Sequence, residues 1–166
     1  DVRRAEEMGI SLFAGEAEGR LDCVLQDAAN KKLEPLYNFM DDLPDLEGAI
    51  APLLPADRIK RVMGGHTSFD AGRGCPFSCS FCTIINVQGQ KSRWRTADDV
   101  EGIVRTNLAQ GIHSFFITDD NFARNKNWEA IFDRLIYLRE VEKIDLKCSI
   151  QVDTGCHRIP NFIDKA

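Results

Sequence analysis

Three cysteine residues, Cys75, Cys79 and Cys82, lie within eight positions of the sequence. Thiolates are soft ligands that suit iron–sulfur clusters, zinc and cuprous copper. Three of them on one short loop can bind three irons of a 4Fe–4S cube and leave the fourth iron open to an external ligand. A ferredoxin loop differs, because its proline follows a fourth cysteine, whereas Pro76 here follows the first cysteine. The spacing therefore favours a 4Fe–4S cluster with one open iron.

Two other interpretations of this loop remain open. Structural zinc takes four ligands, usually in two pairs, so Cys148, Cys156 or His157 would have to complete a zinc site. The third interpretation is a set of reduced cysteines that bind no metal. A disulfide framework is not expected, because a chain of 166 residues with 43% hydrophobic residues can build an ordinary core. We therefore expect a cytoplasmic protein whose thiols are reduced.

The loop from Arg73 to Cys82 resembles the cluster motif of the radical S-adenosylmethionine (SAM) superfamily, Cys-x-x-x-Cys-x-aromatic-Cys. The three cysteines stand at its positions, and Phe81 is its aromatic residue. The resemblance, over residues 63–166, implies that SAM binds the open iron and is cleaved reductively to methionine and a 5′-deoxyadenosyl radical. It also implies that Phe81 lies near the adenine. The alternative for Phe81 is an ordinary place in the core.

The same resemblance implies an enzyme that acts on a small-molecule or lipid-like substrate, which the sequence does not identify. It implies an electron donor such as flavodoxin or ferredoxin, and it assigns no catalytic residue beyond the cluster. A non-catalytic metal module, with structural zinc or with an electron-transferring cluster, is the alternative function. The net charge of −5 gives no general attraction to nucleic acid. No apolar run reaches the ~18 residues that a transmembrane helix needs.

Strand and helix patterns alternate from Met63 onward, and these elements must position the cysteine loop. Strands are predicted over three segments: His66–Ala71, Ser114–Thr118 and Leu146–Val152. Thr96 and Asn127 are predicted N-caps of two intervening helices. The apolar face of the second helix contains Ile131, Leu135 and Leu138. This alternation predicts right-handed βαβ units and a parallel sheet.

Polar residues follow the second and third predicted strands. Asp119, Asp120 and Asn121 come after the second strand, and Gln151 and Asp153 lie near the end of the third. Ligands of parallel sheets gather at the carboxyl ends of the strands, so we expect these residues and the cysteine loop on one rim. The family resemblance implies that the Asp119–Asn121 turn contacts the SAM amino group, although it departs from the usual Gly-Gly-Glu-like sequence. The alternative is a solvated turn that caps the next helix.

Three basic residues, Lys91, Arg93 and Arg95, surround Trp94. They could face a carboxylate or a phosphate. A short basic run is a weak signal, and we therefore expect a solvated loop at this position.

The N-terminal part of the chain has a different pattern. Residues 9–33 predict a short strand over Ile10–Ala14, a turn over Gly15–Gly19 and a helix. Residues 34–62 contain four of the six prolines, a density that predicts an extended connection without long helices. Residues 9–33 resemble the last strand, loop and helix of the flavodoxin-like, cobalamin-binding domain that precedes the barrel in one radical SAM subgroup. The Asp-x-His-x-x-Gly signature of a lower axial ligand is absent from this chain.

The predicted fold is therefore α/β: a partial (β/α) radical SAM barrel with its first three β/α units, preceded by the tail of a flavodoxin-like cobalamin-binding domain. The predicted boundaries are 1–33 for the tail, 34–62 for the linker and 63–166 for the barrel. The subgroup resemblance implies cobalamin in a longer parent protein, where it would support methyl transfer. Because the chain starts at Asp1 without an initiator methionine and stops in a predicted helix over 159–166, we expect an internal fragment that is inactive by itself.

Overall fold

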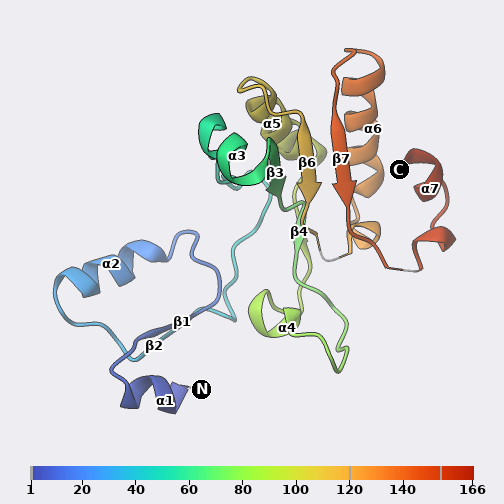
Figure 1. Ribbon diagram of the computed structural model, residues 1–166. Coiled ribbons are helices and arrows are strands. Elements are labelled where there is room, and N and C mark those ends of the chain that lie inside the picture. Colours follow the sequence, from blue (N-terminus) through green and yellow to red (C-terminus); the bar gives the residue numbers. More distant parts are fainter. Residues whose placement is uncertain (1, 120, 154) are drawn as a thin grey trace. The chain divides into compact units, whose positions relative to one another are not determined.

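The computed structural model describes residues 2–119, 121–153 and 155–166 (Figure 1). The chain divides into two compact units. Unit 1 combines Asp1–Asp45 with Gly74–Ser92, and unit 2 combines Leu46–Arg73 with Arg93–Ala166. The cysteine loop thus belongs to unit 1, whereas the polar residues predicted at the strand ends belong to unit 2.

Unit 1 contains a small βαβ arrangement. Its elements are α1 (Val2–Glu7), β1 (Leu12–Ala14), α2 (Leu21–Ala29), β2 (Leu36–Asn38) and α4 (Ile84–Val87). Strands β1 and β2 are parallel and α2 connects them. The strand and the helix predicted over residues 9–33 correspond to β1 and α2. Strand β2 was not predicted, because it follows Pro35 in the proline-rich segment. The proline lies just outside the strand, where its carbonyl still accepts a hydrogen bond from the Leu12 N–H at 3.0 Å.

Unit 2 is built around a parallel sheet of three strands in the order β3-β6-β7. The strands of this sheet are β3 (His66–Phe69), β6 (Ser114–Ile117) and β7 (Lys147–Ile150). Two further strands of unit 2, β4 (Gly72–Arg73) and β5 (Arg93–Trp94), form a separate antiparallel pair. The helices of unit 2 are α3 (Ala56–Met63), α5 (Ala97–Leu108), η1 (Phe122–Arg124), α6 (Trp128–Glu140), η2 (Cys156–Arg158) and α7 (Phe162–Lys165). The three predicted parallel strands are therefore confirmed, each slightly shorter than expected.

Helix α3 is a second element that the proline-rich segment was not expected to contain. It begins directly after Pro55, the last proline of that segment, and its C-cap Gly64 has the left-handed conformation. A proline just before a helix removes no intrahelical hydrogen bond. The proline density therefore prevented long helices but left room for this one.

One face of the sheet packs against α5 and α6. Alternate strand residues, among them Phe69, Phe115 and Ile117, join the buried residues of both helices in a single core cluster. On the opposite face Ser68 and Phe116, which are partners in the strand register, are exposed. The helix-covered face explains the two-residue periodicity of burial along β3 and β6.

The two predicted N-caps behave differently. Thr96 forms a capping box with Asp99: its hydroxyl accepts the Asp99 N–H at 3.1 Å, and the Asp99 carboxylate accepts the Thr96 N–H at 2.8 Å. Asn127 does precede α6, but its side chain donates to the Arg95 carbonyl at 2.8 Å instead of capping the helix. Of the C-terminal helix predicted over 159–166, only the short α7 is helical, and η2 lies just before that range.

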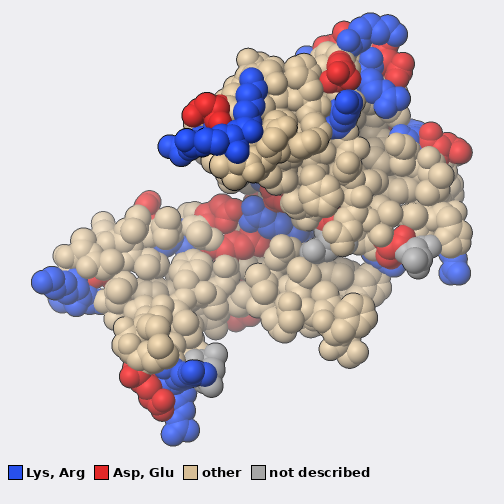
Figure 2. All heavy atoms as spheres, in the orientation of Figure 1, with Lys and Arg blue, Asp and Glu red and all other residues tan. Residues whose placement is uncertain are grey.

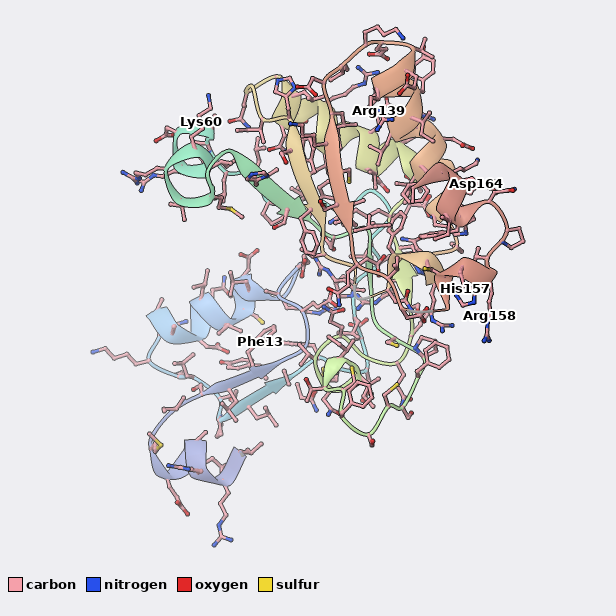
Figure 3. The ribbon with its side chains drawn as sticks, turned by 45° about the vertical axis from the view of Figure 1, so that its right-hand side comes forward. Phe13, Lys60, Arg139, His157, Arg158 and Asp164 are labelled. Carbon is pink, nitrogen blue, oxygen red and sulfur yellow. The ribbon has the colours of Figure 1, made fainter. Side chains whose placement is uncertain are left out.

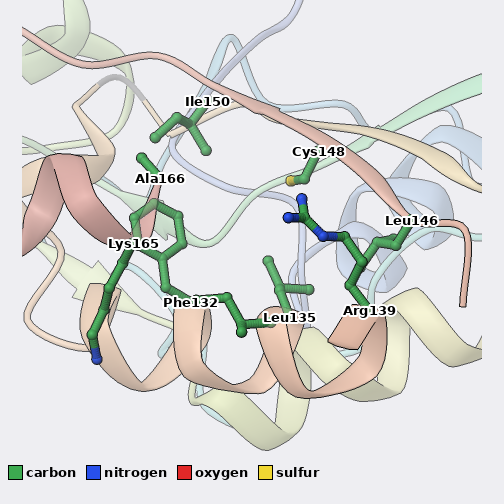
Figure 4. A pocket seen from close by; sticks show the side chains of 9 residues that line it. Phe132, Leu135, Arg139, Leu146, Cys148, Ile150, Lys165 and Ala166 are labelled. Carbon is green, nitrogen blue, oxygen red and sulfur yellow. The ribbon is translucent and has the colours of Figure 1, made fainter. Parts of the chain in front are cut away.

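Strand β7 forms the edge of the sheet beside a small apolar cleft (Figure 4). Its lining includes Phe132, Leu135, Arg139, Leu146, Cys148 and Ile150. Although Cys148 as a whole is exposed at the edge, its thiol points into this cleft, and burial raises the pKa of the thiol to about 11. The thiol therefore stays protonated at neutral pH.

Surface charge and helix length relate to the predictions on nucleic-acid binding and on transmembrane helices. Acidic and basic side chains are interspersed over the face of the molecule that Figure 2 shows, rather than gathered by sign. Within the described residues, no helix combines the length and apolar character needed to cross a membrane.

Candidate functional site

The cysteine loop leaves and re-enters unit 2 through a short antiparallel stem. Gly72 pairs with Trp94 and Arg73 pairs with Arg93, so β4 and β5 hold the two ends of the loop together. Strand β4 follows directly after β3, at its carboxyl end. The sequence therefore connects the loop to the end of the sheet where parallel strands place their ligands.

Inside the loop, backbone contacts fix the start of the cysteine motif. Gly74 has a φ of 82°, and a Cβ at this position would lie 2.4 Å from the Lys91 carbonyl oxygen, so only glycine fits. The Gly74 N–H donates to the Gln88 side chain at 3.0 Å. The next N–H, that of Cys75, donates to the Gly89 carbonyl at 3.2 Å. The segment after the cysteines thus folds back onto the residue before them.

The cysteine thiols are accessible and unpaired with one another. Cys79 is exposed, Cys75 and Cys82 are half-buried, and all three are free cysteines. The Cys82 N–H donates to the Cys79 carbonyl at 3.1 Å, which closes a turn between the second and third cysteine. Three soft thiolates on one accessible loop suit an iron–sulfur cluster.

Two further observations concern the residues of this loop. Among the described residues, no group of three or more His, Cys, Asp or Glu side chains is close enough to hold a metal ion. The Phe81 side chain is 89% exposed; it is therefore available for stacking and is not part of a core.

The residues named as partners for a zinc site have other surroundings. The Cys148 thiol faces the apolar cleft and has a raised pKa, which disfavours the thiolate that metal binding requires. Cys156 is half-buried beside the core of unit 2. His157 and Arg158 lie exposed on η2 (Figure 3).

The expectation of a solvated basic loop was wrong for two of its three residues. Arg95 is fully buried and Arg93 is 6% exposed, whereas Lys91 is exposed. The Arg95 guanidinium donates to the Asp70 carbonyl at 2.9 Å and to the Ala49 carbonyl at 2.6 Å, and it lies 3.3 Å from the Asp70 carboxylate. Because β5 pairs with β4, the arginine points into unit 2, where these oxygens satisfy its donors.

The polar residues at the ends of β6 and β7 form a hydrogen-bonded network. The Asn121 side-chain N–H donates to the Asp153 carboxylate at 2.6 Å, and the Asp153 N–H returns a bond to the Asn121 side-chain oxygen at 3.3 Å. The Phe122 N–H also donates to the Gln151 carbonyl at 3.0 Å, while the Gln151 residue is exposed. The structure therefore brings Asn121, Gln151 and Asp153 together on one rim, as predicted from the strand order.

Asp153 is the centre of this network. Besides Asn121, its carboxylate accepts from Arg124 Nε at 3.1 Å, from Arg124 Nη2 at 2.7 Å and from the Gly155 N–H at 2.7 Å. Three of these four bonds end on Oδ2 and one ends on Oδ1. The Arg124 guanidinium, followed by the Asn121 amide, holds the pKa of the Asp153 carboxyl below its usual range.

Asp119 is held in a different manner. Its Oδ2 accepts from the Asn125 side-chain amide at 3.2 Å. The same amide donates to the Ala71 carbonyl at 3.1 Å. A Cβ on Gly72 would lie 2.7 Å from Asp119 Oδ2, so the carboxylate rests against the bare backbone of β4. Asp120, the middle residue of the predicted turn, lies outside the described residues.

Sequence reasoning missed three residues of this rim: Gly72, Arg124 and Asn125. Gly72 has an ordinary φ, so no turn signal marked it. Arg124 and Asn125 follow the apolar pair Phe122 and Ala123 within η1 and its end, where polar residues are common. Their importance comes from partners that are distant in sequence.

Comparison with known proteins decides the family. A sequence profile of the radical SAM superfamily matches residues 70–165, more than half of the chain. The chain belongs to the radical SAM superfamily. The match begins at the end of β3 and includes the cysteine loop and both rim segments. The α/β architecture with a parallel sheet is consistent with part of a radical SAM β/α fold.

Several relatives of this chain carry the names of methyltransferases. Bacteriochlorophyllide d C-8(2)-methyltransferase of Chlorobaculum tepidum is 30% identical over 136 residues, which cover 72% of this chain and 30% of that protein. Hopanoid C-2 methylase of Rhodopseudomonas palustris is 30% identical over 150 residues, which cover 89% of this chain and 27% of that protein. Cytidylyl-2-hydroxyethylphosphonate methyltransferase of Streptomyces wedmorensis is 41% identical over 54 residues, which cover 32% of this chain and 10% of that protein. The chain thus spans less than a third of the length of these relatives.

Proposed function

We propose that the chain forms the cluster-binding and SAM-binding part of a radical SAM methyltransferase that modifies a small-molecule or lipid-like substrate. The observation that carries this proposal is the three-cysteine loop inside the region that matches the family. The names of the relatives add methyl transfer to it, because each describes a methylation enzyme.

In this proposal, Cys75, Cys79 and Cys82 bind three irons of a 4Fe–4S cluster. The accessible thiols and the absence of a competing disulfide among them support this assignment. When bound, the cluster supplies the electron that cleaves SAM reductively to methionine and a 5′-deoxyadenosyl radical. Phe81, with its exposed ring, stacks on the adenine.

The residues of unit 2 bind the methionine part of SAM. Asp119 receives the ammonium group, because a carboxylate at the carboxyl end of a parallel strand is suited to a cationic ligand. Asn121 and Asp153 fasten the two loops that carry the site, and the exposed Gln151 contributes an amide. Asp120, which lies outside the described residues, contributes a second carboxylate to SAM binding in this proposal.

We further propose that the full-length protein uses cobalamin as the methyl carrier. The βαβ arrangement of β1, α2 and β2 in unit 1 is compatible with the end of a flavodoxin-like domain. An electron donor such as flavodoxin or ferredoxin would reduce the cluster.

The test uses the full-length protein, reconstituted anaerobically with iron and sulfide. We expect a brown protein that releases 5′-deoxyadenosine from SAM when reduced and whose cluster electron paramagnetic resonance (EPR) spectrum changes on SAM addition. With methyl-labelled SAM and extracted cell metabolites, the label should appear on a carbon atom of a small molecule.

The alternative of a non-catalytic metal module makes opposite predictions. A colourless protein with stoichiometric zinc would contradict the cluster. A brown protein whose EPR spectrum is unchanged at saturating SAM would contradict SAM binding and favour electron transfer. The family match and the relatives' names do not favour this alternative.

A further inference from the structure

Asn125 is a buried polar residue whose side chain is fully engaged. It is 1% exposed, and its amide nitrogen donates to Asp119 Oδ2 at 3.2 Å and to the Ala71 carbonyl at 3.1 Å. Its side-chain oxygen accepts the Asn127 N–H at 2.9 Å. With both of its N–H donors and its oxygen in use, this amide has a single defined orientation.

Gly72 also lies next to the Asp119 carboxylate. A Cβ on Gly72 would be 2.7 Å from Asp119 Oδ2 and 3.0 Å from Trp94 Cδ1. Real Cβ atoms do not approach an oxygen this closely, so any larger residue here would displace the carboxylate. The backbone of Gly72 has a negative φ, which means that alanine would be tolerated by the chain itself.

The two acidic residues of the rim therefore have different surroundings. Asp153 accepts four hydrogen bonds, two of them from the Arg124 guanidinium, and serves to tie the ends of β6 and β7 together. Asp119 accepts a hydrogen bond from the amide of Asn125, whose side chain is itself buried and held by two further hydrogen bonds. The orientation of the Asp119 carboxylate therefore depends on a fixed donor.

We propose that Asn125 is a positioning residue that, together with Gly72, holds the Asp119 carboxylate in the orientation in which it receives the SAM ammonium group. This inference rests on the proposed function. Asn125 itself touches neither SAM nor the cluster; it acts through Asp119. A substitution of Asn125 therefore lowers the affinity for SAM in addition to any loss of stability.

The experiment measures SAM binding to the full-length, cluster-loaded protein by EPR titration. Equilibrium dialysis of S-adenosylhomocysteine, which keeps the amino group and is not cleaved, gives a second readout. We expect Asp119→Ala and Asn125→Ala each to weaken binding about tenfold. Gly72→Ala should weaken it about threefold or more while the unfolding temperature changes little.

Two matched controls separate positioning from folding. Asn107 is another buried asparagine, but it donates to the Ile103 carbonyl of its own helix; Asn107→Ala should lower stability and leave SAM affinity unchanged. A Cβ on Gly102 would meet nothing within 4 Å, so Gly102→Ala should leave SAM affinity unchanged.

The double variant Asn125→Ala with Asp119→Ala decides the mechanism. If Asn125 acts through Asp119, the double variant should bind SAM no more weakly than Asp119→Ala alone. Independent, multiplicative losses would overturn the proposal, as would a folded Asn125→Ala protein with wild-type affinity. If Asn125→Ala does not fold, the affinity of Gly72→Ala for SAM decides instead, and a wild-type affinity of that variant would overturn the proposal.

A wild-type protein that holds a cluster but never binds SAM would refute the proposed function. That result is distinct from the outcomes that test Asn125.

Discussion

The cysteine loop and the rim of the parallel sheet hold their candidate functional groups in different ways. In the loop, Cys75 and Cys82 are fixed through backbone N–H groups, and the Cys79 side chain is exposed. At the rim, Asp119 and Asp153 are held by side chains from other segments of the chain. Local spacing brings the candidate groups of the loop together, whereas tertiary packing brings those of the rim together.

This difference has a consequence for mutations. A change to a loop cysteine should remove metal binding and leave unit 2 folded, because the thiols contribute little to a core. A change to a hydrogen-bonded side chain at the rim should alter stability and SAM binding together, because the same hydrogen bonds serve both. The following predictions, from the largest expected effect to the smallest, test this contrast.

Cys79→Ala should abolish stable cluster binding in the full-length protein, because it removes the only protein ligand of one iron. Visible absorption and iron content after anaerobic reconstitution measure the loss. Cys23→Ala is the matched control: Cys23 is also an exposed thiol of unit 1, outside the motif, and the cluster should be retained. A full cluster in Cys79→Ala would refute the ligand assignment.

Arg95→Ala should lower the free energy of unfolding by about 3–5 kcal/mol, because it leaves a carboxylate and buried carbonyls without their cationic partner. Chemical denaturation monitored by circular dichroism measures this change. Arg139→Ala, which removes an arginine with 62% side-chain exposure, should change stability by less than about 1 kcal/mol. Equal effects would show that the stem beneath the loop does not depend on the buried arginine.

Asp153→Asn should change how stability depends on pH. The folded pKa of Asp153 is lowered, chiefly by Arg124, so its contribution is present above the ordinary carboxyl pKa of about 4 and is lost as the pH falls through the lowered value. Because its side chain is 36% exposed, solvent screening limits the contribution to roughly 1 kcal/mol.

Thermal unfolding of the wild type and of Asp153→Asn at pH 7 and at pH 3 provides the measurement. The difference in midpoint should be larger at pH 7 than at pH 3. In an Arg124→Gln background most of this pH dependence should disappear. A difference that grows toward low pH would contradict the sign of the pKa shift.

Gly102→Ala should stabilise the protein by up to about 1 kcal/mol, because Gly102 lies inside α5 with open space around its Cα. Thermal unfolding at neutral pH detects the gain. Gly72→Ala is the contrasting glycine variant at the rim and should show no such gain. A stabilisation of the same size in both variants would show that a Cβ at Gly72 does not clash with the Asp119 carboxylate.

Much of the fold was predictable from local sequence. The alternating strand and helix patterns after Met63 predicted the three parallel strands, and Thr96 predicted the start of α5. The proline-rich segment was harder, because proline breaks elements it interrupts but permits those that begin beside it. Strand β2 and helix α3 both begin directly after a proline, which explains why they were missed.

The sequence by itself determined the spacing on which the proposed chemistry of the cysteine loop rests, because three cysteines and an aromatic residue lie within one short segment. The tertiary structure alone decided which polar residues are buried and paired. Asn121 meets Asp153 across 32 residues, and Asn125 meets Ala71 across 54. No local pattern encodes such distances: parallel strands bring their carboxyl ends together only after the intervening helices have packed on the sheet.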